Sequence, residues 1–393
     1  MDNLVLRGSI FDGDEYFDEG VVVVNSSTGL IEACGRANEV EIPTNAQILG
    51  GNEVCIIPGL MDTHLHFFAS KTHSLVEWVS VPETLAALRS VRDLRALLRA
   101  GFTTVRELGS KCATHLSKAV DEGVVEGPTI ISSSKSLAQT GGDDDPLTLP
   151  LNVARELSYS YYCDGPWECR KAVRMVVRDG GRVVKVYASG SFAQGGRVRR
   201  QFTVEELRAI VDEAHASGLK VAAHAYGEEA LTNAVEAGVD SIEHGIGLTE
   251  EIAYKMKEKG IFYVPTLSAY VGSENTGSYE RRSLVQRHLK NDMEIAMNVG
   301  LKIVCGSDFV GSDRDPHGQN YREIVYLSER IGNRLALRAA TSTAADCVGV
   351  NTGRIKQNTP ADIVLVRGSP LQDIMAISPQ RVLHVIKAGR IVF

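Results

Sequence analysis

Six side chains that can bind a cation or carry a proton stand inside short apolar runs or at their ends. They are His64, His66, Lys185, His224, His244 and Asp308. A buried lysine or carboxylate without a partner costs several kcal/mol. A divalent cation removes that cost by accepting the lone pairs of imidazoles and carboxylates. The conjunction of the six therefore predicts a metal site, although singly a His-x-His pair can arise by chance and a lysine can extend its amine to solvent.

The segments that would position these side chains alternate between strand-like and helical patterns. Apolar runs that predict strands cover 57–66, 102–107, 129–133, 183–188, 219–224, 240–244, 261–265 and 301–306. Amphipathic helical patterns follow a Ser80-x-x-Glu83 capping box and a Thr203-x-x-Glu206 capping box, and recur over 112–122, 167–179, 228–237, 250–259, 281–299 and 320–349. Eight strands that alternate with helices predict an α/β fold, a (β/α)8 TIM-like barrel. A doubly wound open sheet is the alternative.

The barrel prediction places all six side chains at one end of the molecule, because barrel enzymes carry their function at the C-terminal ends of the strands. His64 and His66 end the first strand and, as residues i and i+2, point to the same side. The other four follow in chain order at the fourth, fifth, sixth and eighth strands. No G-x-G-x-x-G follows the first strand, so a dinucleotide site has no support.

The two ends of the chain differ from its middle. Residues 1–56 and 353–393 show short β-rich runs and turn residues, such as KAGR at 387–390, without a helical period. Neither end has enough apolar surface for a core of its own. We therefore expect both ends to pair into one small β-domain, 1–56 plus 353–393, beside a barrel of residues 57–352.

Composition bounds the class of protein. The 393-residue chain has 44% hydrophobic and 23% charged residues and a formal charge of −7, values of an ordinary globular protein. The acidic balance argues against nucleic acid as a partner, because phosphate binding needs a basic patch. Seven cysteines without C-x-x-C spacing argue against a disulfide framework or a zinc ribbon. Since no signal-peptide pattern or bilayer-spanning run is present, we expect a cytoplasmic protein without membrane contact.

Several motifs resemble those of the amidohydrolase superfamily. They are IIPGLMDTHLH at 56–66, GFTTVR at 101–106, Lys185 with ASG at 188–190, HAYG at 224–227, IEHG at 242–245 and GSD at 306–308. The sequence is most similar to the branch of prolidase-like and Xaa-Arg dipeptidases, ochratoxin-type amidases and imidazolonepropionase relatives. This resemblance implies a metal-dependent hydrolase, a β-sandwich built from both termini beside the barrel, and a homo-oligomer.

The resemblance also implies a role for each predicted ligand. The His-x-His pair would bind the more buried metal ion, and His224 with His244 the second. Lys185 matches a lysine that is carboxylated and bridges both ions, and Asp308 matches a carboxylate that binds metal and handles protons. Burial lowers the pKa of a lysine, and a neutral amine can capture carbon dioxide. We expect two divalent ions, with zinc as the first candidate.

The expected reaction is hydrolysis of an amide-type C–N bond in a small molecule such as a dipeptide or an N-acyl amino acid. A metal-bound hydroxide would attack the carbonyl carbon, and Asp308 would take the proton and return it to the leaving nitrogen. Tyr226, in the family's His-x-Tyr-Gly pattern, would donate a hydrogen bond to the carbonyl oxygen of the substrate; a packed aromatic is its alternative. A cyclic amide, carbamate or urea-like substrate is the alternative reaction, and a barrel without catalysis is a third hypothesis.

One motif departs from the family pattern. Near relatives commonly carry Thr-Gly-Gly-His after the third strand, whereas this sequence has QTGGDDD at 139–145, so Asp143 replaces a histidine that helps to position substrate. An acid there would repel a substrate carboxylate and attract a cation. Arg197 and Arg199, in the loop after the fourth strand, could clamp an anionic group, and His317 could touch substrate. Solvated surface charges and a structural histidine are the alternatives.

Overall fold

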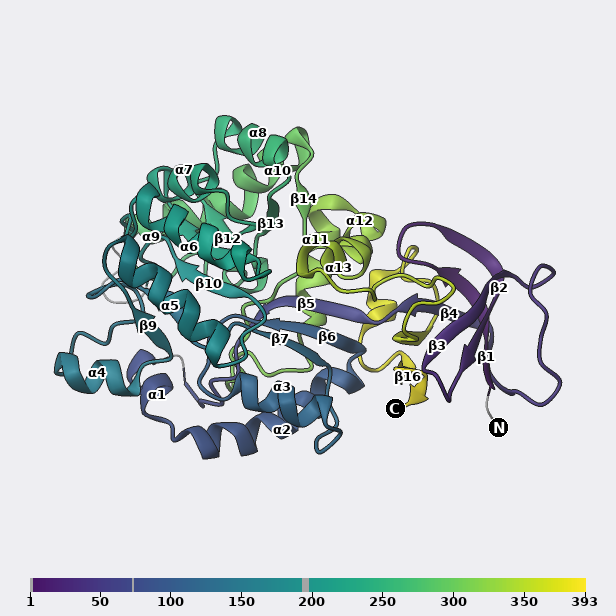
Figure 1. Cartoon of the computed structure of the whole chain (residues 1–393). Helices are drawn as coiled ribbons and strands as arrows, with labels where there is room; N and C mark the ends of the chain where they lie inside the picture. The colour runs from purple at the N-terminus through teal and green to yellow at the C-terminus, as the bar shows by residue number, and fades with distance from the viewer. Residues whose placement is uncertain (1–2, 73, 193–197) are drawn as a thin grey trace.

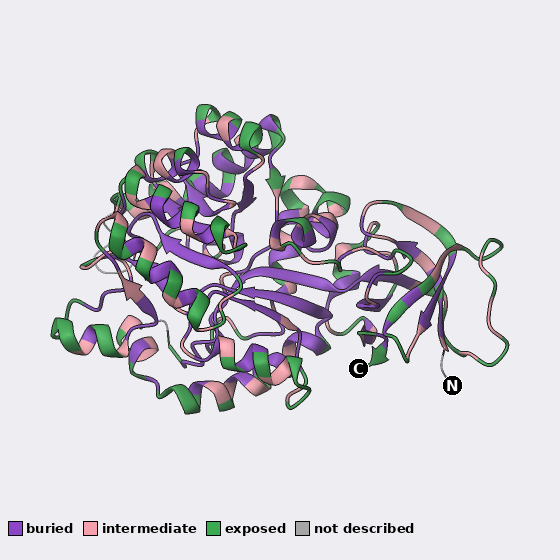
Figure 2. Cartoon of the chain, in the orientation of Figure 1, coloured by how far each residue is buried: buried purple, intermediate pink, exposed green. Residues whose placement is uncertain are grey.

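The computed structural model describes residues 3–72, 74–192 and 198–393. Figure 1 shows two parts: a group of strands wrapped by helices, and a β-rich part that holds both chain termini. In Figure 2 the inner strands are buried while the helices expose their outer faces. The predicted α/β class, a barrel beside a β-rich domain, is confirmed.

The β-rich part is a single seven-stranded sheet in the order β17-β16-β15-β4-β1-β2-β3. Its strands are β1 (Asn3–Phe11), β2 (Tyr16–Asn25), β3 (Leu30–Arg36), β4 (Gln47–Pro58), β15 (Ile363–Arg367), β16 (Val382–Lys387) and β17 (Arg390–Ile391). β15 pairs antiparallel with β4, with Ile363 opposite Pro58, so the two ends of the chain share one sheet. The turn predicted at 387–390 joins β16 to β17 in a hairpin, where Ala388 and Gly389 have φ of 46° and 76°, the left-handed backbone of a two-residue turn.

Eight parallel strands form the barrel. They are β5 (Leu60–Leu65), β6 (Phe102–Glu107), β7 (Thr129–Ser132), β10 (Val184–Tyr187), β11 (Val221–Tyr226), β12 (Ser241–Ile246), β13 (Phe262–Val264) and β14 (Lys302–Ile303). Each overlaps one of the runs predicted as strands. Two short strands that the sequence did not reveal, β8 (Ser136–Ala138) and β9 (Ser160–Tyr162), extend the sheet at β10. Three residues are too few to show a period, and the QTGGDDD run follows β8 directly.

Backbone hydrogen bonds outside the regular strands close the ring. Asp308 N donates to His64 O (2.7 Å), so the segment after β14 runs beside β5 although β14 itself is short. At the opposite seam, Arg182 N donates to Ser132 O (2.7 Å) and ties the start of β10 to β7. The first and last barrel strands therefore bring their polar C-terminal ends together.

Helices cover the outside of the strands. They are α1 (Leu75–Ser80), α2 (Glu83–Arg99), α3 (Ala113–Asp121), α4 (Leu151–Leu157), α5 (Pro166–Arg178), α6 (Val204–Ala216), α7 (Glu228–Ala237), α8 (Glu250–Lys259), α9 (Tyr279–Arg287), α10 (Met293–Val299), α11 (Tyr321–Ile331), α12 (Asn333–Ala339) and α13 (Ser342–Val348), with 3-10 helices η1 (Leu267–Ala269) and η3 (Ile374–Ile377) and π-helix η2 (His288–Asp292). None in the described ranges combines the length and hydrophobicity that a bilayer-spanning helix needs. The predicted Thr203 capping box starts α6, since Thr203 and Glu206 exchange both hydrogen bonds.

The predicted Ser80-x-x-Glu83 capping box is wrong. Ser80 ends α1, and its hydroxyl donates to Val76 O (2.5 Å). α2 begins at Glu83 behind Pro82, which has φ of −58° and ψ of 135°. A proline disfavours helical backbone in the residue before it, and Val81 is extended accordingly. The chain therefore turns between two helices where the spacing alone predicts a cap.

Two long helical predictions are interrupted. The 281–299 segment forms α9, the π-helix η2 and α10, and the 320–349 segment forms α11, α12 and α13. Gly332 has φ of 79° between α11 and α12, a backbone that continues no helix. An amphipathic period survives such a break, so the sequence pattern does not reveal it.

Candidate metal centre and active site

The C-terminal ends of the barrel strands surround a cavity of about 260 Å³. All six side chains predicted as metal ligands line it: His64, His66, Lys185, His224, His244 and Asp308. The four histidines and Lys185 are buried, and the Asp308 side chain is 25% exposed. The structure thus brings together residues from five different strands, as the barrel prediction requires.

Three of these residues form a compact group of donor atoms. His64 Nε2 lies 3.4 Å and His66 Nε2 lies 3.3 Å from Asp308 Oδ1. One ligand atom from each lies within 4.8 Å of the others, a separation at which the three could hold one metal ion. The other ring nitrogen of His66, Nδ1, lies 3.1 Å from Gly109 O, so the ring is oriented from behind.

The two later histidines face the same space. The His244 ring lies 4.9 Å from the His64 ring and 4.7 Å from the His224 ring, measured between ring centres. His224 Nε2 is buried and has no hydrogen-bond partner among the described residues. Burial, followed by the charge of Lys185, lowers the pKa of His64 and His224 well below the ordinary value. Neutral imidazoles with an unused lone pair are the form that binds a metal.

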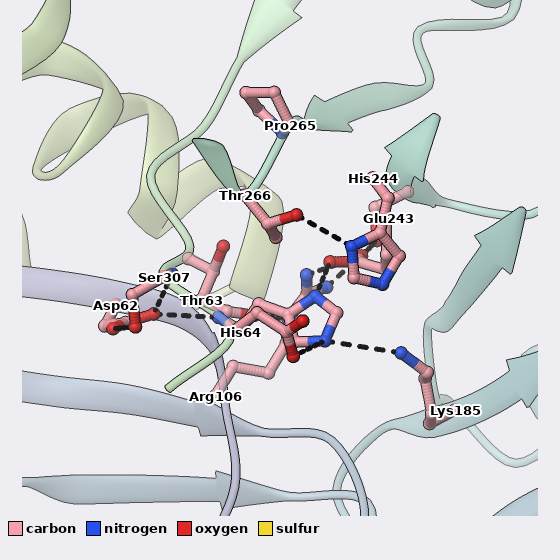
Figure 3. Close-up of polar contacts among 12 residues, drawn as sticks. Asp62, Thr63, His64, Arg106, Lys185, Glu243, His244, Pro265, Thr266 and Ser307 are labelled. Carbon is pink, nitrogen blue, oxygen red and sulfur yellow. Dashed lines mark hydrogen bonds and ion pairs between the residues drawn. The ribbon is translucent and has the colours of Figure 1, made fainter. Parts of the chain in front are cut away.

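Lys185 lies at the centre of the group. Its Nζ is 3.4 Å from His64 Nε2 (Figure 3), and it lies 5.0 Å from the centre of the Tyr187 ring. Burial lowers the pKa of Lys185, while Glu243 and Asp308 oppose that shift. An apolar side chain packed at this position would stabilise the fold at least as well as a buried amine. The lysine therefore indicates a functional role.

The backbone at the cavity is strained at two of the predicted ligands. His244 and Asp308 have φ of 63° and 59°, left-handed values that residues other than glycine rarely adopt. A Cβ at Gly306 would lie 2.7 Å from His64 Cβ, so only glycine lets the segment after β14 approach β5 this closely. Burial would raise the pKa of Asp308, but His64 and His66 hold it below its ordinary value, so its carboxylate is ionised at neutral pH.

Glu243 orients the first histidine, a role that the sequence did not reveal. Its Oε2 lies 2.8 Å from His64 Nδ1, and its Oε1 accepts from Arg106 Nη2 (2.7 Å) (Figure 3). Both charged side chains are fully buried. A carboxylate on Nδ1 keeps the proton on that nitrogen and leaves Nε2 with a lone pair for a cation. The sequence offered one indication of this pair, since a glutamate and an arginine stand inside two of the apolar runs that predict strands.

Glu243→Gln is expected to lower the affinity for divalent metal about 10- to 100-fold, because an amide no longer enforces that tautomer. Chelator competition followed by metal analysis measures this affinity. Glu107→Gln is the matched control, since Glu107 is also buried on a barrel strand but accepts a hydrogen bond from Ser132 (3.1 Å) and none from a predicted ligand among the described residues. Equal affinities in the two variants would contradict the orienting role.

Asp62 joins the two ends of the barrel behind the ligands. It accepts hydrogen bonds from His64 N (3.0 Å), Ser307 Oγ (2.6 Å) and Asn320 Nδ2 (2.7 Å). Since the donors belong to β5, to the segment before Asp308 and to the start of α11, one buried carboxylate fixes their relative positions. The sequence shows Asp62 inside the motif at 56–66, but it does not show which residues hydrogen-bond to Asp62.

Tyr226 lines the cavity, stacked on His224 with ring centres 4.4 Å apart. Its hydroxyl lies 2.5 Å from the hydroxyl of Tyr270, which in turn lies 3.0 Å from His244 Nδ1. Thr266 Oγ1 is a second partner of that nitrogen, at 2.7 Å (Figure 3). Tyr270 and Thr266 lie in the turn after β13, where sequence analysis named no functional residue.

Aromatic side chains build the outer wall of the cavity. Phe68 stacks on His66 with ring centres 4.8 Å apart, and Trp78 and Tyr159 pack against Phe68 at 4.7 and 4.6 Å. Tyr187 and Phe192 also line the cavity. Such a wall keeps water away from the predicted metal ligands and favours the binding of an apolar part of a substrate.

The predicted substrate residues differ in where they lie. Asp143 lines the cavity, and its Oδ1 accepts from Ser191 N (2.8 Å) and Ser191 Oγ (2.7 Å). Arg197 lies outside the described residues, and the Arg199 side chain is exposed. His317 is buried behind the first strand, with Nε2 3.0 Å from His66 O. The structure therefore brings Asp143 to the site, leaves Arg199 at the surface, and gives His317 a role in positioning β5.

Comparisons with known proteins agree with this architecture. The profile of the amidohydrolase family matches residues 55–392. An ochratoxinase from Aspergillus niger is 32% identical over 371 residues, which cover 86% of this chain and 75% of the relative. The crystal structure of A. niger ochratoxinase aligns with a TM-score of 0.90 at 28% identity over 99% of this chain and 95% of that one. A crystal structure of a prolidase complexed with N-methylphosphonate-L-proline aligns with a TM-score of 0.88 at 34% identity over 99% of both chains.

The resemblance found in the sequence motifs is thereby confirmed over most of the chain. The matched range of the family profile contains every described barrel strand and all six side chains gathered at the cavity. The two crystal structures align with this chain over 99% of its length at 28% and 34% sequence identity. The chain belongs to the amidohydrolase family and is a hydrolase that acts on carbon–nitrogen bonds.

Proposed function

We propose that this enzyme uses two divalent metal ions to hydrolyse the amide bond of a dipeptide or an N-acyl amino acid. The observation that carries the proposal is the convergence of four histidines, a buried lysine and an ionised aspartate on one cavity. The buried His224 Nε2 without a partner supports it, because an unsatisfied buried nitrogen is costly unless a ligand completes it.

The donor set fits two cations. His64, His66 and Asp308 would hold one ion, and His224 and His244 the other. Lys185 is buried with a lowered pKa, which increases the fraction of neutral amine that can react with carbon dioxide, and the carbamate would be a ligand shared by both ions. When bound, the ions supply Lewis acidity toward the substrate carbonyl and make a water molecule acidic enough to attack at neutral pH. Zinc is the first candidate because histidine nitrogen and carboxylate oxygen are its usual ligands.

The residues of the chain supply the proton transfers. Asp308 is ionised at neutral pH, so its carboxylate can take the proton of the attacking water and pass it to the leaving nitrogen. Tyr226 stands at the cavity wall with its ring against His224 and His244, where its hydroxyl can donate to the carbonyl oxygen as negative charge develops there. The Phe68 side of the cavity excludes bulk water during these steps.

Two arginines at the cavity favour a substrate with a carboxylate. Arg281 lines the cavity and is held by Ser273 O (2.7 Å) and Thr276 O (2.9 Å). Arg314 lines it as well. A guanidinium fixed by backbone oxygens still has donors that match a carboxylate. The relatives include a prolidase solved with a proline phosphonate, which supports a substrate that ends in an amino acid.

Asp143 is expected to make substrate binding depend on pH. Burial, followed by the nearby Asp144, raises the pKa of Asp143 to about 7. Its carboxyl is therefore neutral below that pH and anionic above it. For an N-acyl amino acid with a free carboxylate, we expect KM to rise as the pH increases through about 7, because like charges repel.

Steady-state kinetics on the native enzyme and on Asp143→Asn, over a pH range from about 6 to 8, measures this effect. The asparagine variant should keep a low KM across the range. An identical rise of KM in both proteins would show that Asp143 does not face the substrate carboxylate.

A substrate panel tests the proposed function. The panel contains N-acyl amino acids, Xaa-Pro and Xaa-Arg dipeptides, and, as the alternative class, a lactam, a carbamate and a phenylurea. Turnover of the first group and not of the second supports the proposal, and the reverse pattern contradicts it. A cytoplasmic location, a homo-oligomeric state and the absence of nucleic-acid partners stay predictions from the sequence.

A further inference from the structure

A chain of hydrogen bonds leads from the metal-site histidine His244 to the cavity-lining Tyr226. Thr266 Oγ1 and the Tyr270 hydroxyl lie 2.7 and 3.0 Å from His244 Nδ1. The Tyr270 hydroxyl lies 2.5 Å from the Tyr226 hydroxyl. All four side chains are buried, with exposures between 0% and 5%, so the chain is shielded from competing water.

The role of His244 sets the direction of this chain. Two oxygens converge on Nδ1, and Figure 3 shows the other ring nitrogen turned toward the space beside Lys185. A histidine that binds a cation through Nε2 carries its proton on Nδ1. Nδ1 then has no lone pair to accept a hydrogen bond, so the Tyr270 hydroxyl cannot donate to it. The other side-chain partners of this hydroxyl are Thr266 and Tyr226. Thr266 Oγ1 already accepts the Nδ1 proton at 2.7 Å, which leaves the Tyr226 oxygen, at 2.5 Å, to accept the Tyr270 proton.

The Tyr226 hydroxyl is directed by this arrangement. When its oxygen accepts from Tyr270, its own proton is left to point into the cavity that Tyr226 lines. We propose that Tyr270 is a positioning residue for hydrolysis, because it orients the Tyr226 hydroxyl so that the proton of Tyr226 is offered to the carbonyl oxygen of the substrate. This inference rests on the proposed function, in which Tyr226 is the donor.

The turn that carries Tyr270 is held rigidly. It follows Thr266, whose φ of 51° is left-handed, and contains η1. Glu323 of α11 accepts from Leu267 N (2.9 Å) and from Ser268 N (2.7 Å), which fixes the start of that 3-10 helix. The His288 ring meets the Tyr270 ring edge-on at 5.2 Å. Donors that are preorganised in this way need no reorganisation during the reaction.

A double-mutant cycle tests the inference. Tyr226→Phe is expected to lower kcat about 100-fold, as loss of one oxyanion donor does. Tyr270→Phe removes the orienting hydroxyl and leaves Thr266 on His244, so we expect a loss of kcat of about 10-fold with unchanged metal content. Because Tyr270 acts through Tyr226, the double variant should be no slower than Tyr226→Phe alone. Tyr263→Phe is the matched control, since the buried Tyr263 hydroxyl has no partner among the described residues.

Each outcome separates the inference from the proposed function. Multiplicative losses in the double variant, or full activity in Tyr270→Phe, would overturn the inference. Loss of metal from Tyr270→Phe would also overturn it, since Tyr270 would then act by holding His244. Full activity in Tyr226→Phe would instead refute the oxyanion role within the proposed function. Metal analysis and thermal unfolding of all variants show whether each is folded and loaded, so a misfolded protein is not mistaken for a slow one.

Discussion

Replacing Lys185 by alanine is expected to lower kcat by at least about 10³-fold, because the two proposed ions would supply several kcal/mol of transition-state stabilisation and each 1.4 kcal/mol is tenfold. Lys185 Nζ lies 3.4 Å from His64 Nε2 at the centre of the ligand group. Without a group that binds both ions, the remaining imidazoles would hold less metal. Steady-state kinetics and metal analysis of the same purified samples measure the two losses together.

The matched control for this change is Lys257→Ala. Lys257 Nζ donates to Val299 O (2.7 Å) on the helical surface and does not line the cavity. This variant should keep its metal and its kcat. Addition of a short-chain carboxylate such as propionate to Lys185→Ala should restore part of both, because a free carboxylate would take the place of the proposed carbamate. Native metal content and activity in Lys185→Ala would contradict the bridging role.

Asp308→Asn is expected to lower kcat by about 10²- to 10⁴-fold, the range for loss of a general acid–base group. The amide keeps the shape of the side chain but cannot take a proton from water. His64 and His66 hold the pKa of Asp308 low despite its burial, so the native carboxylate accepts protons throughout the neutral range. KM should change much less than kcat, because the group acts after the substrate has bound.

Asp313→Asn is the comparison for this variant, since Asp313 is exposed in the same loop region. It should leave kcat and KM close to native. A loss in Asp308→Asn that is confined to KM would instead assign Asp308 to substrate binding. Metal content must be measured in parallel, because Asp308, with His64 and His66, could also hold a metal ion.

The convergence of the six side chains on one cavity could be predicted from the sequence because barrel topology alone brings strand ends together. His64 and His66 obey the two-residue period of a strand, and His224, His244 and Asp308 each end an apolar run. No knowledge of side-chain contacts was needed to place them. Both ends of the chain likewise show β patterns without a core of their own, and β4 pairs with β15 for that reason.

The residues that tune the ligands could not be predicted, because their partners are set by packing. Glu243 faces His64 across the barrel, and Tyr270 reaches His244 from a turn with left-handed backbone. His317 shows the converse. The sequence makes it a candidate for contact with substrate, yet its ring is buried against Phe67 and its Nε2 lies 3.0 Å from His66 O. Spacing along a chain does not determine which side of a loop faces a cavity.

The amount of metal in the native enzyme decides whether this hydrolase uses two metal ions. The protein is purified without chelators or an affinity step on immobilised metal, and its metals are quantified by plasma mass spectrometry against protein from amino-acid analysis. We predict about two divalent ions per chain, with loss of activity on chelation and its return when zinc is added. Full turnover of an amide substrate by protein that contains no metal would contradict it.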